Sequence, residues 1–359
     1  MIKMALKTKS KKARKMCLFP KLLPNPKYKS TKKNRGAVPE IKDERVKMVP
    51  VGCGKCMECQ KKRAREWQVR LQEEIRTDNT GQFVTLTFSN ESIKELAEEV
   101  ETEGYERDND IATIGVRRFL ERWRAKHKKS VKHWLITELG HRGTENIHLH
   151  GIIFSQQKEE IINRWNYGYV FIGSYVNERT INYCIKYATK IDQVNKFYKP
   201  KILTSPGIGK NYVNRYDARL NQFKEEGETN DTYTTRQGRK IALPIYWRNK
   251  IYSEEEREQL WLKKLDKQKR YVDKIEIDVS TPEGLQIYYK VLEDAQKKNA
   301  RIGYGDDKEN WEQKNYEIQR RNLNFKKRIT NLWKYVDPET GEIFEKQNKT
   351  KSLIKIKKP

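Results

Sequence analysis

The stretch HWLITELGHRGTENIHLHGIIF, residues 133–154, predicts two β-strands joined by a short connection. Residues 133–139 and 147–154 are rich in apolar and β-branched side chains. The GHRGTEN segment between them has the glycines and polar residues that are typical of turns. Strands joined by so short a segment pair in antiparallel orientation. We therefore predict that this hairpin forms the centre of the fold.

Two histidines, His148 and His150, occupy alternate positions of the second strand and therefore point to the same side of it. If the connection turns about Gly143, Glu138 lies opposite His148 on the neighbouring strand, about 5 Å away between Cβ atoms. Two imidazoles and a carboxylate could then bind one divalent cation and leave positions open for a substrate. The alternative interpretation is a buried polar patch without a metal. Two other candidates for the third ligand lie in the connection itself, His141 and Glu145.

Further strands and helices are predicted on both sides of the hairpin. FVTLTF alternates between apolar and threonine side chains, as a strand does, and GVRRFLERWRAKHKK has apolar side chains at helical spacing. A mixture of helices with an antiparallel hairpin predicts an α+β fold, in which helices cover a central antiparallel sheet. The elements expected are, in order, a strand at 83–88, a helix within 115–129, strands at 133–139 and 147–154, a helix at about 158–166, a strand at 169–173 and a helix at 181–190.

A basic helix is predicted before the first of these strands. Ala64, Trp67, Leu71 and Ile75 repeat at helical spacing, so a helix is expected from about residue 58 to 76. Arginines occupy its other faces, and the helix within 115–129 is basic as well. Because arginine side chains neutralise phosphates, we predict that both helices contact nucleic acid. The arginines assigned to this contact are Arg63, Arg65, Arg70, Arg117, Arg118 and Arg122.

The overall charge of the chain indicates a polyanionic partner. Its 359 residues include 76 Lys and Arg against 49 Asp and Glu, a formal net charge of +27. DNA or RNA is the first partner that this excess suggests, and an anionic membrane surface is the second. No apolar run approaches the ~20 residues of a membrane span, and the N-terminus lacks the apolar core of a signal peptide. We therefore expect a cytoplasmic protein.

Shifts in composition divide the chain into three parts. Residues 1–39 contain 13 Lys or Arg and no Asp or Glu, and such a run is typically disordered or wrapped around an anion. The C-terminal third is highly charged and is expected to be helical in part. We predict a basic arm at 1–50, a globular domain at 51–250 and a charged, partly helical extension at 251–359.

INYCIKYATK, residues 181–190, predicts an amphipathic helix with an unusual polar face. At 3.6 residues per turn, the polar stripe holds Tyr183, Lys186, Tyr187 and Lys190, and the opposite stripe is apolar and suited to a core. A phenol can attack a phosphodiester that a cation activates, and nearby ammonium groups can stabilise the developing charge. Together with the histidine pair, this stripe predicts the transfer of a DNA phosphate to tyrosine. The alternative interpretation is a solvated face on which lysine stems cover tyrosine rings.

Three of the five cysteines, Cys53, Cys56 and Cys59, repeat as C-x2-C-x2-C, which indicates a metal site rather than disulfides. Three thiolates so close together can bind zinc or an iron–sulfur cluster, and Cys17 is a candidate fourth ligand. A structural Zn2+ there would fasten the basic arm to the core, whereas three reduced thiols are the alternative. Cys184 lies on the apolar stripe of residues 181–190 and is expected only to pack.

Several of these segments resemble one family of DNA-processing enzymes. HLHGIIF has the histidine–hydrophobic–histidine signature of the HUH endonucleases, FVTLTF resembles their first motif, and YCIKYATK resembles their third motif in its two-tyrosine form. CLFPKLLPNPKY, CGKCMECQKKRAREW, WNYGYVFIG and SPGIGKNY are similar to the replication initiators of the gokushovirus branch of the microviruses, which are small single-stranded DNA phages. The resemblance covers roughly residues 16–215.

This resemblance implies rolling-circle initiation of DNA replication by a metal-dependent nicking and joining endonuclease in the 51–250 domain. With Mg2+ or Mn2+ at the His148, His150 and Glu138 site, one tyrosine would cut the plus strand at the origin and keep its 5′ end. The freed 3′ hydroxyl would prime a host polymerase, and the second tyrosine would later cut the regenerated origin so that the displaced strand closes into a circle. The third metal ligand varies among HUH enzymes.

The resemblance does not extend to a built-in helicase. The only partial match to a phosphate-binding loop, GIGK at 207–210, has Thr204 where the upstream glycine is required. A host helicase is therefore expected to unwind the duplex origin.

Two other functions are compatible with parts of the sequence. A non-catalytic, basic, zinc-stabilised nucleic-acid-binding protein, used in packaging or regulation, would account for the charge and the cysteines but not for the histidine pair and the tyrosine–lysine stripe. A relaxase or a single-strand transposase would keep the chemistry in another biological setting, although the phage-like motifs argue against it. Covalent attachment to a labelled single-stranded oligonucleotide distinguishes an enzyme from a binder.

Overall fold

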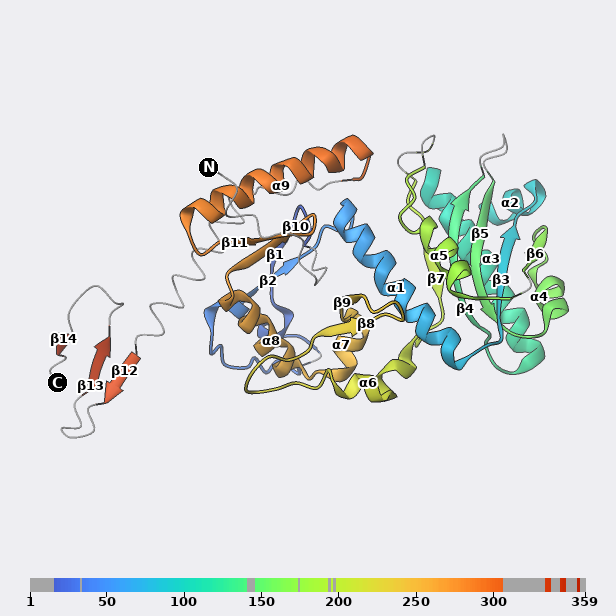
Figure 1. Cartoon of the computed structure of the whole chain (residues 1–359). Coiled ribbons are helices and arrows are strands. Elements are labelled where there is room, and N and C mark those ends of the chain that lie inside the picture. The colour runs from blue at the N-terminus through green and yellow to red at the C-terminus, as the bar shows by residue number, and fades with distance from the viewer. Residues whose placement is uncertain are drawn as a thin grey trace.

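A five-stranded sheet, antiparallel at every neighbouring pair, forms the centre of one half of the structure (Figure 1). From edge to edge its strands are β6 (Val170–Ile172), β3 (Gly81–Thr87), β5 (Ile147–Phe154), β4 (Lys132–Leu139) and β7 (Ile202–Thr204). The computed structural model describes residues 16–32, 34–140, 146–173, 175–192, 195 and 198–305, together with the backbone of three short strands beyond them. The predicted α+β fold with a central antiparallel sheet is confirmed.

The central hairpin of β4 and β5 has the register that the sequence predicted, with Glu138 opposite His148. On its other side β5 pairs with β3, where Thr85 lies opposite His150. A Cβ atom at Gly151 would collide with the backbone carbonyl oxygen of Trp134. Only glycine lets the strands approach so closely at this position, immediately after His150. The pairing of three adjacent strands therefore fixes where the histidines lie.

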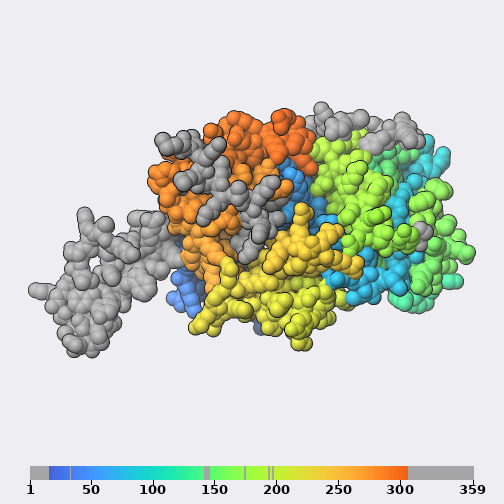
Figure 2. All heavy atoms as spheres, in the orientation of Figure 1, coloured from blue at the N-terminus to red at the C-terminus, as the bar shows by residue number. Residues whose placement is uncertain are grey.

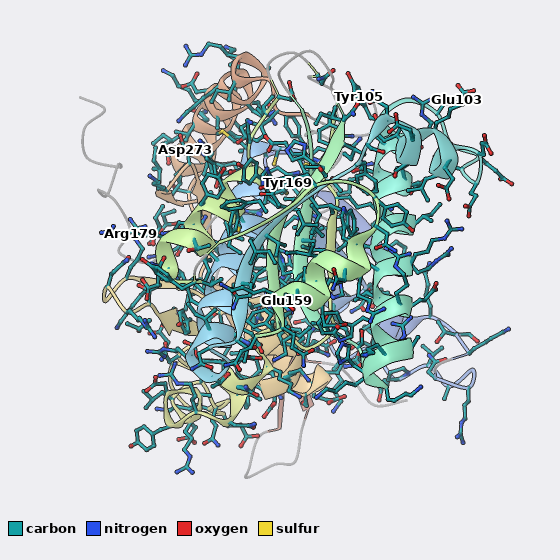
Figure 3. All side chains as sticks on the ribbon, turned by 90° about the vertical axis from the view of Figure 1, so that its right-hand side faces the viewer. Glu103, Tyr105, Glu159, Tyr169, Arg179 and Asp273 are labelled. Atoms are coloured by element: carbon teal, nitrogen blue, oxygen red, sulfur yellow. The ribbon has the colours of Figure 1, made fainter. Side chains whose placement is uncertain are left out.

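Helices cover both faces of this sheet. On one face lie α2 (Asn90–Ala97), α3 (Gly104–His127) and α4 (Lys158–Trp165), and on the other lie α1 (Met57–Thr77) and α5 (Glu178–Tyr187). Figure 3, which is turned by 90°, shows α1 and α3 on opposite sides of the strands. Strand alternation explains this division. Leu135 and Leu149 belong to the core beneath α3, whereas Trp134 and Ile152 belong to the core beneath α1 and α5.

Helix α1 joins the sheet to the rest of the chain. Leu71 packs with the residues of the sheet and α5, whereas Val69 packs with a separate cluster that surrounds Trp247. The carboxylate of Glu74, which is buried, lies 2.5 Å from the Nζ of Lys132 at the start of β4. A buried carboxylate needs such a partner. The ion pair therefore holds α1 against the central hairpin.

The remaining elements pack against the N-terminal end and the outer side of α1. Leu18 and Phe19 form a buried cluster with Met57 of α1 and with Tyr288 and Leu292 of α9. Figure 2 shows the orange residues of α9 beside the blue start of α1, with the yellow segment that follows η3 below them. In chain order these elements are β1 (Lys21–Pro24), η1 (Pro26–Tyr28), η2 (Glu44–Val46), β2 (Met48–Val51), η3 (Lys210–Asn214), α6 (Tyr216–Arg219), β8 (Thr232–Thr234), β9 (Lys240–Ala242), α7 (Ile245–Ile251), α8 (Glu254–Asp266), β10 (Lys269–Val272), β11 (Ile275–Asp278) and α9 (Pro282–Ile302). Three further strands follow, β12 (Trp333–Val336), β13 (Ile343–Lys346) and β14 (Ile354–Lys355).

Local sequence signals explain where several helices begin and end. The Asn177 side chain accepts hydrogen bonds at the start of α5 and forms a capping box with Thr180. Helix α9 has Thr281 as its N-cap and ends at Gly303, whose φ of 91° is favourable only for glycine. Within the described part of the chain, no helix combines the length and the apolar character needed to cross a membrane.

The structure corrects the expectation for the N-terminal basic run. From residue 16 onward the chain is folded: β1 pairs with β2, and Leu18 and Phe19 are fully or almost fully buried. The apolar letters in CLFPKLL explain this result, because they pack on α1 and α9 while the lysines around them remain on the surface. Residues 1–15 lie outside the described residues. The division at 50 and 250 stays a prediction.

Two elements inside the predicted order were not expected from the sequence. Helix α2 occupies the segment after β3 that was expected to be a charged loop, and its Leu96 is buried against α3. Strand β7 extends the sheet beyond β4. Each is short, with one or a few apolar residues, so its place is set by the elements that it packs against.

Candidate active site

Glu138, His148 and His150 meet on the face of the sheet that α1 and α5 cover. The Oε2 atom of Glu138 lies 3.0 Å from Nε2 of His150 and 3.4 Å from Nε2 of His148, and the two Nε2 atoms are 3.1 Å apart. His150 and Glu138 are buried, and His148 is partly exposed. The structure therefore brings together the three residues that the sequence singled out. The other candidates for the third ligand, His141 and Glu145, lie outside the described residues.

Hydrogen bonds to the remaining ring nitrogens orient both imidazoles. Nδ1 of His150 lies 3.0 Å from Oγ1 of Thr85, and Nδ1 of His148 lies 3.3 Å from the carbonyl oxygen of Asn146. With Nδ1 engaged in this way, each ring presents Nε2 to the shared site, which is the usual arrangement of metal-binding histidines. Sequence reasoning did not assign Thr85, although strand alternation had placed it on the side away from the apolar core.

The spacing of the three ligand atoms fits one metal ion. Bonds of about 2.0–2.2 Å to a shared ion bring nitrogen and oxygen ligands to within roughly 3–3.5 Å of one another. Burial by itself would raise the pKa of Glu138. The hydrogen bonds from His148, His150 and Lys190 outweigh that effect and hold this pKa well below its usual range. Glu138 is therefore a carboxylate, which is the form that binds a cation.

Tyr183 and Tyr187 lie one turn apart on α5 and both approach the histidines. The Tyr187 ring stacks on His150 with 4.5 Å between ring centroids, and its hydroxyl donates to Oη of Tyr183 at 2.5 Å. Burial, and then the hydrogen bond to Tyr183, raises the pKa of Tyr187 above its usual range. Tyr183 is 47% exposed, whereas Tyr187 is 8% exposed. The two phenols thus share one location but differ in their access to solvent.

The predicted polar stripe over residues 181–190 was wrong in two respects. Helix α5 ends at Tyr187, so Lys190 lies in the turn beyond it, where its Nζ reaches Oε1 of Glu138 at 2.5 Å. Tyr187 is buried with the core residues rather than solvated, because its hydroxyl finds a polar partner inside the site. Lys186 is exposed, as predicted. Cys184 is fully buried in the core, and its predicted packing role is confirmed.

Phe83 is a further residue at the site that sequence reasoning did not assign. Its ring lies 5.7 Å from that of Tyr183 and 6.3 Å from that of His150, between centroids. On its other side the ring of Phe171 on the edge strand β6 lies 6.3 Å away and is 46% exposed. Phe83 therefore supports the candidate nucleophile from the sheet and connects it to an exposed aromatic side chain.

The arginines of α3 do not lie at this site. Arg117, Arg118 and Arg122 belong to the helix layer on the opposite face of the sheet (Figure 3). One guanidinium nitrogen of Arg118 donates to both carboxylate oxygens of Glu99 at 2.7 Å, and Arg122 donates to the carbonyl oxygen of Arg164 at 2.8 Å. The contact of these three arginines with nucleic acid stays a prediction, and Arg118 and Arg122 already hold close protein partners.

The arginines of α1 lie in the same layer as the site. Arg70 is held between aromatic rings, with its guanidinium carbon 4.1 Å from the ring centroid of Trp67 and 4.0 Å from that of Tyr246. Arg63 is exposed and Arg65 is partly exposed. Arg63 and Arg65 are therefore better placed than Arg70 to meet a ligand.

Four cysteines form a second cluster, at the start of α1. Thiol sulfurs of Cys17, Cys53, Cys56 and Cys59 all lie within 4.8 Å of one another, and those of Cys17 and Cys56 are 3.8 Å apart. Sulfurs bound at ~2.3 Å to one zinc ion in tetrahedral geometry lie roughly 3.8 Å apart. Backbone amides point at two of these sulfurs, with the Cys53 amide 3.1 Å from the Cys17 sulfur. The predicted fourth ligand is in place, and the cluster could hold a structural metal.

Comparison with known proteins agrees with the site. Residues 81–192 match the model of a family whose description begins "Replication-associated protein". No curated protein and no solved structure matches the chain. The matched segment begins at β3 and ends just beyond α5, so it contains every residue of the histidine, glutamate and tyrosine cluster. The match supports a role in the initiation of replication.

Proposed function

We propose that the protein initiates rolling-circle DNA replication by cutting and rejoining a single DNA strand at the origin. The observation that carries this proposal is the convergence of a three-residue metal-binding set with two tyrosine hydroxyls, all on one face of the sheet. Bound to His148, His150 and Glu138, Mg2+ or Mn2+ would polarise the phosphate that is to be cut. The family match over residues 81–192 supports the same role.

Tyr183 acts as the first nucleophile in this proposal, because its side chain is the accessible one of the pair. Its Oη forms a bond to phosphorus while the bond from phosphorus to the 3′ oxygen breaks. The phenol loses its proton and the 3′ oxygen gains one, so the step balances. The products are a 5′-phosphotyrosine link and a free 3′ hydroxyl, and the energy of the phosphodiester is kept for rejoining.

Tyr187 acts in the second cut, after one round of synthesis. Its hydroxyl lies beside that of Tyr183, so a small shift of the strand would bring the regenerated origin to it. The new 3′ hydroxyl then attacks the first phosphotyrosine and closes the displaced strand into a circle. A host polymerase would extend the primer and a host helicase would unwind the duplex origin, in the cytoplasm of a bacterial host.

The four cysteines serve a structural role in this proposal. Zn2+ at Cys17, Cys53, Cys56 and Cys59 would join the N-terminal segment to the first turn of α1. Since α1 packs on both the sheet and α5, the metal would also stiffen the helix layer above the active site.

Covalent capture of DNA tests the proposed function. A randomised library of single-stranded oligonucleotides is labelled at the 3′ end or at the 5′ end and incubated with the protein and Mn2+. A 5′-phosphotyrosine keeps the downstream fragment, so a 3′ label stays on denatured protein and a 5′ label is released. Mass spectrometry of the DNA-linked peptide identifies the tyrosine, and sequencing of the captured DNA identifies the origin.

The matched control is the double variant with Tyr183→Phe and Tyr187→Phe, which keeps both rings and removes only the hydroxyls. It is expected to shift the oligonucleotides in a gel but to retain no label after denaturation. Retention by the double variant would place the nucleophile elsewhere. Binding without any covalent retention by the wild type would identify a non-catalytic nucleic-acid-binding protein instead.

A further inference from the structure

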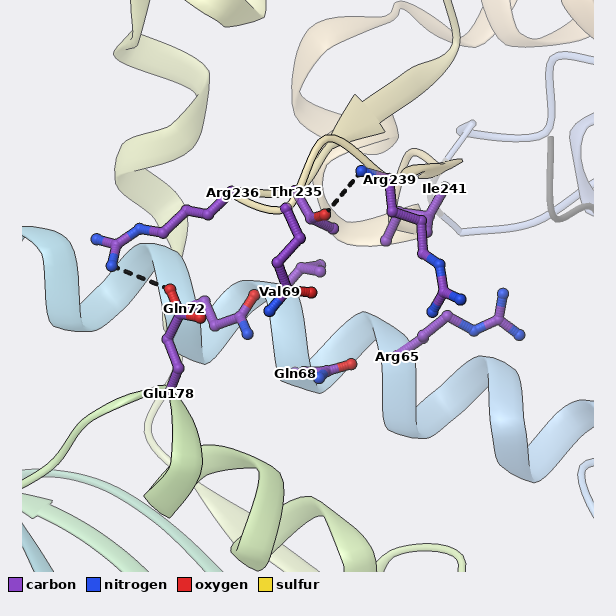
Figure 4. A pocket seen from close by; sticks show the side chains of 10 residues that line it. Arg65, Gln68, Val69, Gln72, Glu178, Thr235, Arg236, Arg239 and Ile241 are labelled. Atoms are coloured by element: carbon purple, nitrogen blue, oxygen red, sulfur yellow. Dashed lines mark hydrogen bonds and ion pairs between the residues drawn. The ribbon is translucent and has the colours of Figure 1, made fainter. Parts of the chain in front are cut away.

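A cationic pocket lies between α1 and the β8–β9 hairpin, beside the first turn of α5 (Figure 4). Its lining includes three arginines and three glutamines, and its single carboxylate is that of Glu178. The turn of the hairpin is held by the Thr235 hydroxyl, which accepts from the amide of Arg239 at 3.2 Å. This turn carries Arg236, Gln237 and Arg239 over the exposed side of α1.

Only one of the three arginines in the pocket has a carboxylate partner among the described residues. Arg236 lies 3.0 Å from Oε1 of Glu178, whereas the guanidinium groups of Arg65 and Arg239 make no ion pair in that part of the chain. Figure 4 shows the side chains of Arg65 and Arg239 directed toward the same space. Burial, and the positive charge of Arg239, lower the pKa of Arg65. Two like charges so placed repel each other, and a bound anion would relieve that repulsion.

The pocket is connected to the helix that carries the candidate nucleophiles. Gln68 on α1 donates from Nε2 to Oδ1 of Asn182 at 2.6 Å, and Asn182 precedes Tyr183. At a rise of about 1.5 Å per residue, Tyr183 lies only about 7–8 Å along α5 from Glu178. A strand held in the pocket therefore passes within a few nucleotides of Tyr183.

We propose that this pocket binds a backbone phosphate of single-stranded DNA and so sets the position of the strand on Tyr183. The proposal rests on the proposed function, because it names where the substrate of the same site is held. Two guanidinium groups can grip one phosphate with charge-assisted hydrogen bonds, and the amides of Gln68 and Gln237 add neutral donors. A contact of this kind fixes register without reading the bases.

Binding of a fluorescein-labelled single-stranded oligonucleotide of random sequence, measured in EDTA, tests the pocket without any cleavage. Arg239→Ala is expected to weaken binding roughly tenfold. The slope of log affinity against log salt should become shallower by about 0.7, the value for one lost phosphate contact on a single strand. Arg239 is exposed on the hairpin, so the variant should fold normally.

Lys240→Ala is the matched control. Lys240 is the next residue and is also exposed, but strand alternation directs it away from the side on which Arg239 and Ile241 line the pocket. It removes the same charge from the same hairpin. Its loss of affinity should be at most about twofold, which is the general effect of lowering the net charge of the protein.

A double-mutant cycle decides whether Arg65 and Arg239 hold one phosphate together. If they do, the Arg65→Ala, Arg239→Ala double variant should lose clearly less affinity than the product of the two single losses. The pair of Arg65→Ala with Lys240→Ala should instead multiply. Equal losses for Arg239→Ala and Lys240→Ala, or a simple product for the arginine pair, would overturn the pocket.

The pocket and the proposed function fail in different ways. If the wild type binds the oligonucleotide with the predicted arginine coupling but retains no covalent DNA, the pocket stands and the nicking function falls. If covalent capture succeeds and Arg239→Ala binds no worse than Lys240→Ala, the function stands and the strand takes another path.

Discussion

The Nζ of Lys190 lies 2.5 Å from Oε1 of Glu138, while Oε2 of the same carboxylate faces the two histidines. One side chain thus holds the turn beyond α5 with one oxygen and completes the candidate metal site with the other. Because α5 carries both tyrosines, the position of the nucleophiles and the geometry of the metal ligands are mechanically coupled. This coupling makes Lys190 a positioning residue rather than a group that touches the substrate.

Lys190→Ala is expected to slow cleavage roughly 10- to 100-fold, which is typical when the outer partner of a metal ligand is removed. The concentration of Mn2+ needed for half-maximal cleavage should rise as well, because Glu138 loses the contact that orients it. Lys190→Arg should restore part of both quantities. Lys186→Ala, which removes an exposed ammonium from the same segment, should slow cleavage much less and leave the metal requirement unchanged. An unchanged metal requirement in Lys190→Ala would contradict the positioning role.

His148→Ala and His150→Ala are each expected to abolish cleavage and leave oligonucleotide binding within about twofold, because basic surfaces carry most of the affinity. Nicking and gel shift are measured together at one salt concentration. Thr85→Val tests the orientation of His150 and should reduce cleavage without abolishing it, since the ligand itself remains. Full cleavage by either alanine variant in Mg2+ or Mn2+ would exclude these histidines as metal ligands.

The two tyrosines should respond unequally in a single cut. Tyr183→Phe is expected to remove most cleavage of an origin oligonucleotide, and Tyr187→Phe should keep most of it, because only Tyr183 is well exposed. Both variants should fail to release closed single-stranded circles over a full replication round, because each lacks one of two required nucleophiles. A larger loss for Tyr187→Phe in the single cut would reverse the assigned order.

The cysteine cluster should hold one metal ion per chain. Elemental analysis of the wild type should find one zinc, and Cys56→Ser should lose it together with several degrees of thermal stability. Cys184→Ala is the control, because that thiol is buried in the core far from the cluster in sequence and is not one of its four members. It should retain the metal. A fully folded wild type without any bound metal would count against a structural site.

Much of the site could be predicted from the sequence because it depends on local periodicity and on one hairpin. Alternation along β5 places His148 and His150 on one side, and a turn centred on Gly143 places Glu138 opposite His148, as observed. The C-x2-C-x2-C spacing likewise brought three sulfurs together, because they lie within one short turn and the start of a helix. The sheet, its hairpin and four of its five strands follow from the same short-range patterns.

Tertiary structure alone decided the rest, because those features depend on which surfaces meet. Nothing in the helical pattern of residues 181–190 indicates that Tyr187 is buried on His150, or that Lys190 leaves the helix to reach Glu138. The same holds for the arginines: α1 and α3 are both basic in sequence, yet the sheet separates them, and only α1 lies in the layer of the site. Periodicity determines which residues share a face, whereas long-range packing determines what that face touches.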